Sequence, residues 1–313
     1  MRDVVVAEVV RSGFVESRHF GAIIALDRSG AVAWSVGVVD EPVFVRSCNK
    51  PIQATAMVRA GLPLRGRLLA LVSASHSGEP MHLEGVREIL DGAGLPESAL
   101  QTPPDYPLGG PTRDAYVAAG GKPSSVAMNC SGKHAGMLAT CVANGWPIET
   151  YRDPDHPLQR RIADELVELT GYEVTAVGVD GCGAPLLGTT LIGLARAFRR
   201  IQQAPSDSPP GAVAEAIGAF PAYVSGSDRD EATLLRSFPG AVAKGGAEAC
   251  YAVAMPDGSA VALKIGDGGG RARAVVMAAA LQRLGFDGPV LEELAHPAVL
   301  GGGERIGEIR AAF

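Results

Sequence analysis

Short apolar runs separated by turn residues dominate the first 46 residues, and this pattern predicts β-strands. The predicted strands are Val4 to Val10, Ala22 to Leu26, Ala31 to Val38, and a short one that ends at Phe44 and Val45. Asp27 to Gly30 supplies a polar turn between the second strand and the third, so these two are expected to form a hairpin. The amino-terminal region should therefore contribute to a sheet.

Beyond Ser47 the apolar residues recur at helical spacing, so the middle of the chain is predicted to be mostly helical. The predicted helices are one that begins after Ser47 and ends near Gly61, then His82 to Leu90, Asp155 to Leu169, and Pro185 to Ile201. Asp155 is expected to cap the third helix, with Pro157 in its first turn. Proline and glycine predict loops at Gln101 to Thr112 and at Ala204 to Gly211.

The last third of the chain returns to strands. Cys250 to Met255 and Ser259 to Ile265 flank the hairpin turn Pro256 to Gly258, and a helix is expected from Ala272 to Leu284. Strands at both ends with a helical middle predict an α+β fold, in which the two termini build one sheet and a helical region is inserted between them. We expect a single unit over residues 1–313, with the sheet part at about 1–46 and 225–313 and the helical part at about 47–224.

Composition and charge narrow the classes of function. Of the 313 residues, 47% are hydrophobic and 20% are charged, which is typical of a folded globular protein. The net charge is −6 and no stretch clusters Lys and Arg, which argues against nucleic acid or an anionic membrane surface as a partner. The most apolar long window, Val174 to Ala195, contains Asp180 and Pro185, so no membrane helix is expected.

The number and spacing of the cysteines indicate the cell compartment in which the protein is expected. The five cysteines, at positions 48, 130, 141, 182 and 250, are odd in number and include no Cys-x-x-Cys pair. This pattern favours a reducing cytoplasm over a disulfide framework. Met1 to Val6 also lacks the features of a secretory signal, so a soluble cytoplasmic protein is expected.

Lysine is scarce: of the 28 basic residues only five are lysine, at positions 50, 122, 133, 244 and 264. An ammonium can lose its proton when it is partly buried and a guanidinium cannot, so each lysine position is informative. In the stretch Ser47 to Lys50 the amine follows the hydroxyl by one helical turn, which suits a serine nucleophile activated by a lysine base. A helix-capping Ser47 with a solvated Lys50 is the alternative.

Two further segments carry groups that suit the same chemistry. Ser75 lies in a polar stretch that directly follows an apolar run. Both active-site loops and ordinary turns occur in that position, so the pattern does not choose between them. Lys264 closes the last hairpin strand, and the order Ser-x-x-Lys, Ser, Lys is that of the serine penicillin-recognising enzymes. A solvent-exposed strand lysine is the alternative for Lys264. Together the three segments favour catalysis.

A second cluster is formed by Asn129 to His134 and by Asp180 to Gly183. Two thiolates from these segments could hold Zn²⁺, with a histidine or a neutral lysine amine as a further ligand. Buried cysteines that act as small apolar residues are the alternative. The Gly132-Lys133-His134 sequence lacks the full phosphate-loop pattern, so a phosphate loop is not expected.

At this point the motifs resemble those of a known family, the Rhizobium-type L-asparaginases, also called asparaginase II. The motifs that carry the resemblance are Arg46 to Pro51, Ala74 to Ser77, Asn129 to His134, Asp180 to Cys182, and Lys264 to Asp267. They occur in family order from near residue 10 to about residue 285. The resemblance implies a fold similar to serine β-lactamases and penicillin-binding proteins, and the family usually forms homodimers.

The resemblance also implies roles for particular residues. Ser47 would be the nucleophile with Lys50 beside it, and Ser75 would pair with Lys264 as a second Ser-Lys couple. The residues implied to bind zinc are Cys130, Lys133 and Cys182, and those implied near the substrate are Arg46, His134 and Asp180. We therefore expect an amidohydrolase that converts L-asparagine to L-aspartate and ammonia through an acyl-enzyme.

Two other functions remain open at this stage. The same fold could carry a glutaminase or a β-lactamase-like serine hydrolase, since a fold by itself does not choose the substrate. A non-catalytic zinc-holding binding protein on the same scaffold is the alternative from another class.

Overall fold

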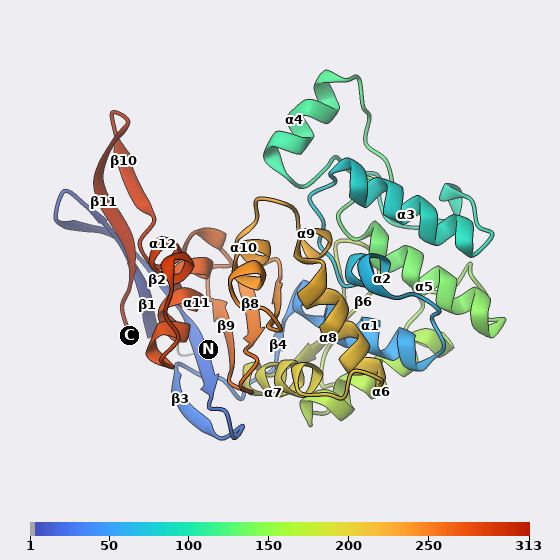
Figure 1. The fold of residues 1–313 in the computed structure, drawn as a ribbon, viewed down its shortest axis with the longest axis horizontal. Helices are drawn as coiled ribbons and strands as arrows, with labels where there is room; N and C mark the ends of the chain where they lie inside the picture. Colours follow the sequence, from blue (N-terminus) through green and yellow to red (C-terminus); the bar gives the residue numbers. More distant parts are fainter. Residues whose placement is uncertain (1–3) are drawn as a thin grey trace.

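Strands from both ends of the chain form one antiparallel sheet, in the computed structural model that describes residues 4–313. The sheet has eight strands in the order β10-β11-β1-β2-β9-β8-β7, with β3 paired to β2 (Figure 1). The strands are β1 (Val4–Arg11), β2 (Phe14–Leu26), β3 (Val32–Val36), β7 (Val242–Gly245), β8 (Cys250–Ala254), β9 (Ala260–Ile265), β10 (Ala298–Gly301) and β11 (Glu304–Ala311).

The junction between the two ends of the chain is the pairing of β2 with β9. Gly21 to Leu26 lie opposite Ile265 to Ala260 in antiparallel register. Every residue of β8 is buried, as is every residue of β9 except the half-buried Lys264. Successive side chains of a strand point to opposite faces, so both faces of the sheet are covered here. Helices α7 and α11, whose bounds follow, both pack against β9.

Most helices lie between the two sets of strands in sequence and to one side of the sheet in space (Figure 1). They are α1 (Lys50–Arg59), α2 (Gly66–Val72), α3 (Pro80–Gly92), α4 (Gly110–Ala118), α5 (Ser131–Asn144), α6 (Pro157–Thr170), α7 (Leu191–Gln202), α8 (Pro209–Ala219), α9 (Pro221–Val224) and α10 (Asp230–Ser237). The later helices are α11 (Arg273–Arg283) and α12 (Pro289–Ala295), and the short 3-10 turns are η1 (Arg46–Asn49), η2 (Glu97–Ala99) and η3 (Gly270–Ala272). The α+β fold, with its sheet built by both ends of the chain, is confirmed.

The helix predicted over Pro185 to Ile201 is wrong in its first part. Pro185–Thr189 is strand β6, which pairs with β4 (Val43–Phe44) and β5 (Val177–Val179) in a separate three-stranded sheet. The helix begins only at Leu191, where the Thr190 hydroxyl accepts a hydrogen bond from Gly193 N–H at 3.0 Å. A short buried apolar run has no periodicity that separates strand from helix, which is why the sequence pattern misled here.

Two other predicted boundaries shift by a few residues. The cap of α6 is His156, whose ring accepts from Leu158 N–H at 3.1 Å, in place of the expected Asp155. Both predicted loops end earlier than expected, because α4 begins at Gly110 and α8 begins at Pro209. No helix among residues 4–313 is long and apolar enough to cross a membrane.

Helix α5 packs closely on α2, and this packing sets the position of the Cys130–His134 stretch. Gly132 and Gly136 face α2, where a methyl group on Gly132 would lie 2.5 Å from the Leu71 carbonyl oxygen. Only a residue without Cβ allows the two backbones to approach this far. The sequence therefore fixes the start of α5 against the segment that leads to Ser75.

Candidate active site

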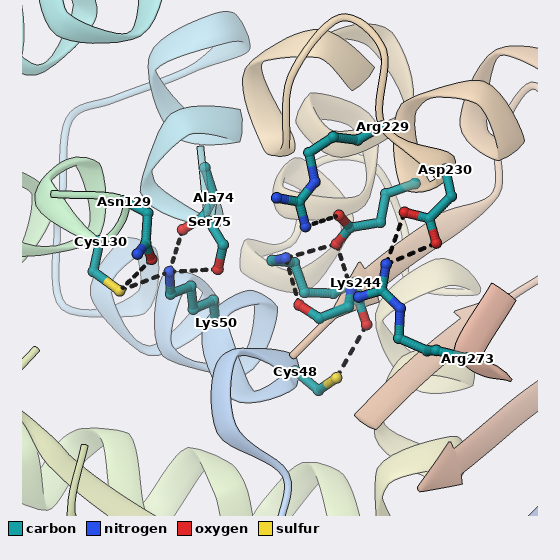
Figure 2. A network of polar contacts seen from close by, with 12 residues as sticks. Cys48, Lys50, Ala74, Ser75, Asn129, Cys130, Arg229, Asp230, Lys244 and Arg273 are labelled. Carbon is teal, nitrogen blue, oxygen red and sulfur yellow. Dashed lines mark hydrogen bonds and ion pairs between the residues drawn. The ribbon is translucent and has the colours of Figure 1, made fainter. Parts of the chain in front are cut away.

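Lys50 is the first residue of α1, and its side chain is 1% exposed. Its amine donates to the Ser75 hydroxyl at 2.9 Å, to the Ala74 carbonyl oxygen, and to the Cys130 sulfur at 3.2 Å (Figure 2). Burial lowers the pKa of Lys50, and the positive charges of Lys133 and Lys244 lower it further, against the opposing effect of Cys130. Burial therefore makes the Lys50 ammonium easier to deprotonate than that of an exposed lysine, and only the deprotonated amine can accept a proton.

Ser47 lies in η1, one turn before Lys50, and is half-buried. Within residues 4–313 its hydroxyl has no hydrogen-bond partner, which leaves it free for a substrate. The residue before it, Arg46, has a φ of 51°. A non-glycine residue in this left-handed region is strained, and such strain is common at functional sites.

Two cysteines and a lysine converge beside Lys50. Cys130, Lys133 and Cys182 are all buried, and the Lys133 amine lies 3.2 Å from the Cys182 sulfur. A hydrogen bond between the two thiol groups lowers the pKa of Cys182 and raises that of Cys130. Burial by itself would lower the pKa of Lys133, but the two sulfurs raise it overall. The cluster thus places a thiol of lowered pKa beside a lysine amine of raised pKa.

His134 borders this cluster and is fixed by Tyr151. The Tyr151 hydroxyl accepts from Gln101 N–H at 3.2 Å and lies 2.7 Å from His134 Nδ1. The Tyr151 hydroxyl can then donate its own proton to His134 Nδ1. In that arrangement the single proton of the neutral His134 ring is on Nε2, on the side of Cys182. Burial, and next the Lys133 charge, lower the pKa of His134 to about 4. The ring is accordingly neutral.

Arg46 and Asp180 form an ion pair at the edge of the site. Arg46 Nε and Nη2 each lie 2.8 Å from Asp180 Oδ1, and Arg46 Nη1 lies 3.7 Å from Glu248. A cavity of about 690 Å³ opens beside this pair, between β4, β5 and the end of β9. Arg46, Glu248 and Lys264 line it. Two positive side chains and one negative side chain thus line one open cavity, and Asp180 is paired with one of them, Arg46.

Among the described residues, no hydrogen bond joins Lys264 to the Ser75 hydroxyl with which it was expected to pair. The Lys264 amine donates to the Glu248 carbonyl oxygen at 2.8 Å, and Ser75 is instead held by Lys50. The structure brings Lys50 together with Ser75 and Cys130, and Lys133 together with Cys182. A functional role for Lys264 stays a prediction.

Lys244 is one of the two lysines, with Lys122, to which the sequence assigned no role. It is fully buried, and its amine donates to Glu231 at 2.8 Å and to the Gly245 carbonyl oxygen at 2.7 Å (Figure 2). Its charge lowers the pKa of Lys50, so the two amines belong to one electrostatic site. The sequence carried one signal for it, since Lys244 follows the apolar residues Val242 and Ala243 and precedes two glycines.

Within residues 4–313 no group of three or more His, Cys, Asp or Glu residues is arranged to hold a metal ion. A metal at the sulfur cluster would therefore need the nitrogen of Lys133 as its third protein ligand. Two thiols and one amine suit Zn²⁺, and three protein ligands leave one position for water or substrate. The donor set fits zinc on these grounds.

Comparison with solved structures gives likenesses at low sequence identity. A β-lactamase from Mycobacterium bovis is 15% identical with a TM-score of 0.47, over 85% of this chain and 95% of that chain. A Bacillus glutaminase is 11% identical with a TM-score of 0.42, over 85% of this chain and 92% of that chain. No curated protein matches the chain significantly.

Comparison with protein families gives one match over almost the whole chain. The family described as L-asparaginase II matches residues 7–311. This range includes every motif that carried the resemblance seen in the sequence, from Arg46 to Asp267. The chain therefore belongs to the L-asparaginase II family.

Proposed function

We propose that the protein hydrolyses L-asparagine to L-aspartate and ammonia through an acyl-enzyme. The observation that carries the proposal is the buried Lys50 amine, which is held on the Ser75 hydroxyl one turn after Ser47. Membership of the L-asparaginase II family supports an amidohydrolase of this kind. A buried amine in contact with a serine hydroxyl is an arrangement that suits serine-lysine hydrolysis.

In the proposed reaction Ser47 attacks the side-chain amide carbon of asparagine, and the neutral Lys50 amine takes the hydroxyl proton. The C–N bond then breaks, and the Ser75 hydroxyl passes a proton from Lys50 to the leaving ammonia. Water then attacks the acyl-enzyme and Lys50 takes its proton. As the ester bond breaks, Lys50 returns that proton to the Ser47 oxygen and aspartate leaves. A backbone N–H group near Ser47 would stabilise the oxyanion, where one donor contributes about 3 kcal/mol. The first two residues of α1 cannot supply it, because the Lys50 N–H donates to the Ser47 carbonyl oxygen and Pro51 has no N–H.

We assign recognition of the charged end of the substrate to the Arg46 and Asp180 pair, with His134 on the inner side. The α-carboxylate of an amino acid suits a guanidinium, and its ammonium suits a carboxylate. Lys264 and Glu248 extend the same charge pattern along the 690 Å³ cavity. A zwitterionic substrate therefore matches the charges at the opening better than a neutral one.

We also propose that Cys130, Lys133 and Cys182 bind zinc. When bound, zinc would supply a positive charge that orients and polarises the substrate. The lowered pKa of Cys182, its contact with Lys133 and the buried position of all three side chains support this assignment. Lys133 would have to give up its proton on binding, so zinc affinity should rise with pH.

The function is tested by incubating the purified protein with asparagine and following ammonia release, beside the Ser47→Ala variant. Release by the wild type and its loss in Ser47→Ala would support the proposal, while full turnover by Ser47→Ala would exclude this nucleophile. Glutamine and a chromogenic cephalosporin in parallel separate a glutaminase or a β-lactamase. Stoichiometric zinc with no hydrolysis of any substrate would favour the zinc-holding binding protein.

The assembly and location expected from the sequence remain part of the proposal. We propose a cytoplasmic homodimer, as the resemblance to the family implies. Light scattering on the purified protein gives the mass directly, and a monomer at micromolar concentration would contradict this part.

A further inference from the structure

A fully buried ion pair lies at the end of the sheet next to the candidate nucleophile. The Lys244 amine and the Glu231 carboxylate are 2.8 Å apart, and both side chains are 0% exposed. The second oxygen of Glu231 lies 3.2 Å from Arg229 (Figure 2). The neighbouring Asp230 makes a separate pair with Arg273 at 2.7 Å. Buried charges of this kind are rare and demand an explanation.

Glu231 holds the backbone of β7 as well as the lysine side chain. The Gly245 N–H donates to Glu231 Oε1 at 2.5 Å, the same oxygen that accepts from Lys244. Strand β7 is the last strand of the sheet, so no neighbouring strand pairs with its outer backbone groups. One carboxylate oxygen thus fixes both the side chain of Lys244 and the peptide that follows it.

The stretch that Glu231 holds lies directly against the turn that carries Ser47. The Cys48 thiol donates to the Lys244 carbonyl oxygen at 3.0 Å. A methyl group on Gly246 would lie 2.8 Å from the Val45 carbonyl oxygen and 3.3 Å from the Ser47 nitrogen. A shift of β7 would therefore be transmitted to the backbone on both sides of Ser47.

We propose that Glu231 is a positioning residue for the hydrolysis, which holds Lys244 to Gly246 in place against the backbone of Ser47. The inference rests on the proposed function, because it assigns Glu231 a part in that reaction. Stability alone is a weak explanation for the pair, since a buried ion pair adds little net stability over an apolar pair of similar volume. A displacement of about 1 Å at an active site, in contrast, can cost about 100-fold in rate.

The test compares Glu231→Gln with Asp230→Asn as a matched control. Both variants remove one carboxylate charge from the same helix, but Asp230 contacts neither Lys244 nor Gly245. We expect Glu231→Gln to lower kcat for asparagine about 100-fold while KM stays within about threefold. Asp230→Asn should keep kcat within about twofold. An equal loss of kcat in the two variants would overturn the proposal.

Two further measurements keep the test decisive. Hydrogen exchange should be at least about tenfold faster at the Gly245 amide in Glu231→Gln than in Asp230→Asn, and equal exchange counts against a positioning role. This readout needs no turnover, so failure of the asparaginase assay on the wild type is distinguishable from failure of the inference. The double variant Glu231→Met, Lys244→Met removes both charges and should fold. Wild-type kcat in that variant would overturn the inference.

Discussion

The Lys50 amine donates to the Ser75 hydroxyl at 2.9 Å, although the sequence motif places it nearest to Ser47. In the proposed reaction, a proton that Lys50 takes from Ser47 would have a path onward to the Ser75 hydroxyl. The same amine also contacts the Ala74 carbonyl oxygen and the Cys130 sulfur. Lys50 thus links the serines to the cysteine cluster.

Substitution of Ser75 tests that path. Ser75→Ala should reduce kcat/KM for asparagine by about 10²–10⁴-fold, the usual contribution of a positioned proton-transfer group. Ser73→Ala is a suitable control, because Ser73 is also buried but its hydroxyl contacts only the Leu69 carbonyl oxygen. Mass spectrometry of trapped intermediates assigns the nucleophile, and an acyl group found on Ser75 in place of Ser47 would reverse the two roles.

The lysines near the site are expected to differ in importance. Lys244→Met should lower kcat by at least about 100-fold, because it leaves the Glu231 carboxylate buried without its lysine partner and disturbs the strand that lies against Ser47. Lys264→Met should lower it by about tenfold or less, since the Lys264 amine is half-buried and meets only a carbonyl oxygen. Steady-state kinetics measures kcat for both variants. A larger loss in Lys264→Met than in Lys244→Met would support the Ser75 and Lys264 couple expected from the sequence.

The sequence predicted the sheet because its strands carry local signals. The turn Asp27 to Gly30 and the turn Pro256 to Gly258 each lie between two apolar runs, and both adjoin strands of the observed sheet. The strand at Pro185–Thr189 follows the turn Asp180 to Gly183, which joins it to β5 in a hairpin, but in the sequence that turn is interpreted as part of a cysteine cluster. Its pairing with β4 is decided by residues distant in sequence. Pairing over such distances leaves no local trace.

The candidate site was predictable only as far as its motifs are local. Lys50 and Lys133 each lie within a few residues of a serine or cysteine, so spacing drew attention to them. Lys244 is brought to the site by the order of strands β9, β8 and β7 and is matched by Glu231 on α10. The contact between Lys244 and Glu231 depends on the order of the strands, and no local pattern in the sequence reveals that order.

The cysteine cluster predicts the metal content. The wild-type protein should bind about one zinc ion per chain, and Cys130→Ser or Cys182→Ser should lose most of it. Cys141→Ser is the control, because Cys141 is buried in the same helix α5 and makes no contact with Lys133. Elemental analysis of dialysed samples measures this, and equal zinc in all four proteins would place the metal elsewhere.

Zinc should also stabilise the fold. At a free concentration 100-fold above its dissociation constant, a ligand specific for the folded state adds about 2.7 kcal/mol to the free energy of unfolding. A chelator should therefore lower the Tm of the wild type and of Cys141→Ser, but leave that of Cys182→Ser unchanged. Thermal unfolding measures the difference, and an identical shift in all three would contradict the assigned ligands.

The close packing of α5 on α2 makes Gly132 sensitive to substitution. Gly132→Ala would bring a methyl group to 2.5 Å from the Leu71 carbonyl oxygen, so α5 must move. We expect a loss of about 1–3 kcal/mol in the free energy of unfolding. Gly92→Ala at the end of α3 has open space around it and should be neutral or stabilising by up to about 1 kcal/mol. Denaturant unfolding of the two variants measures the contrast.

Glu231 should make the stability of the protein depend on acid. Burial alone would raise the pKa of this carboxyl, but Lys244, Arg229 and Arg273 lower it to about 2, from an ordinary value of 4.5. A lowered pKa in the folded state means that the stabilisation is complete above pH 4.5 and is lost as the pH falls toward 2. The shift corresponds to about 3 kcal/mol.

The effect is isolated by comparing the wild type with Glu231→Gln, because other carboxyls also titrate in this range. The variant has no ionisable group at position 231, so its free energy of unfolding should fall less between pH 6 and pH 3 than that of the wild type. Asp230→Asn again serves as the control for the loss of a nearby carboxylate. Urea unfolding at a series of pH values measures the three slopes. Parallel slopes for the wild type and Glu231→Gln would show that Glu231 does not carry this acid sensitivity, and that its charge is not held by the three cations around it.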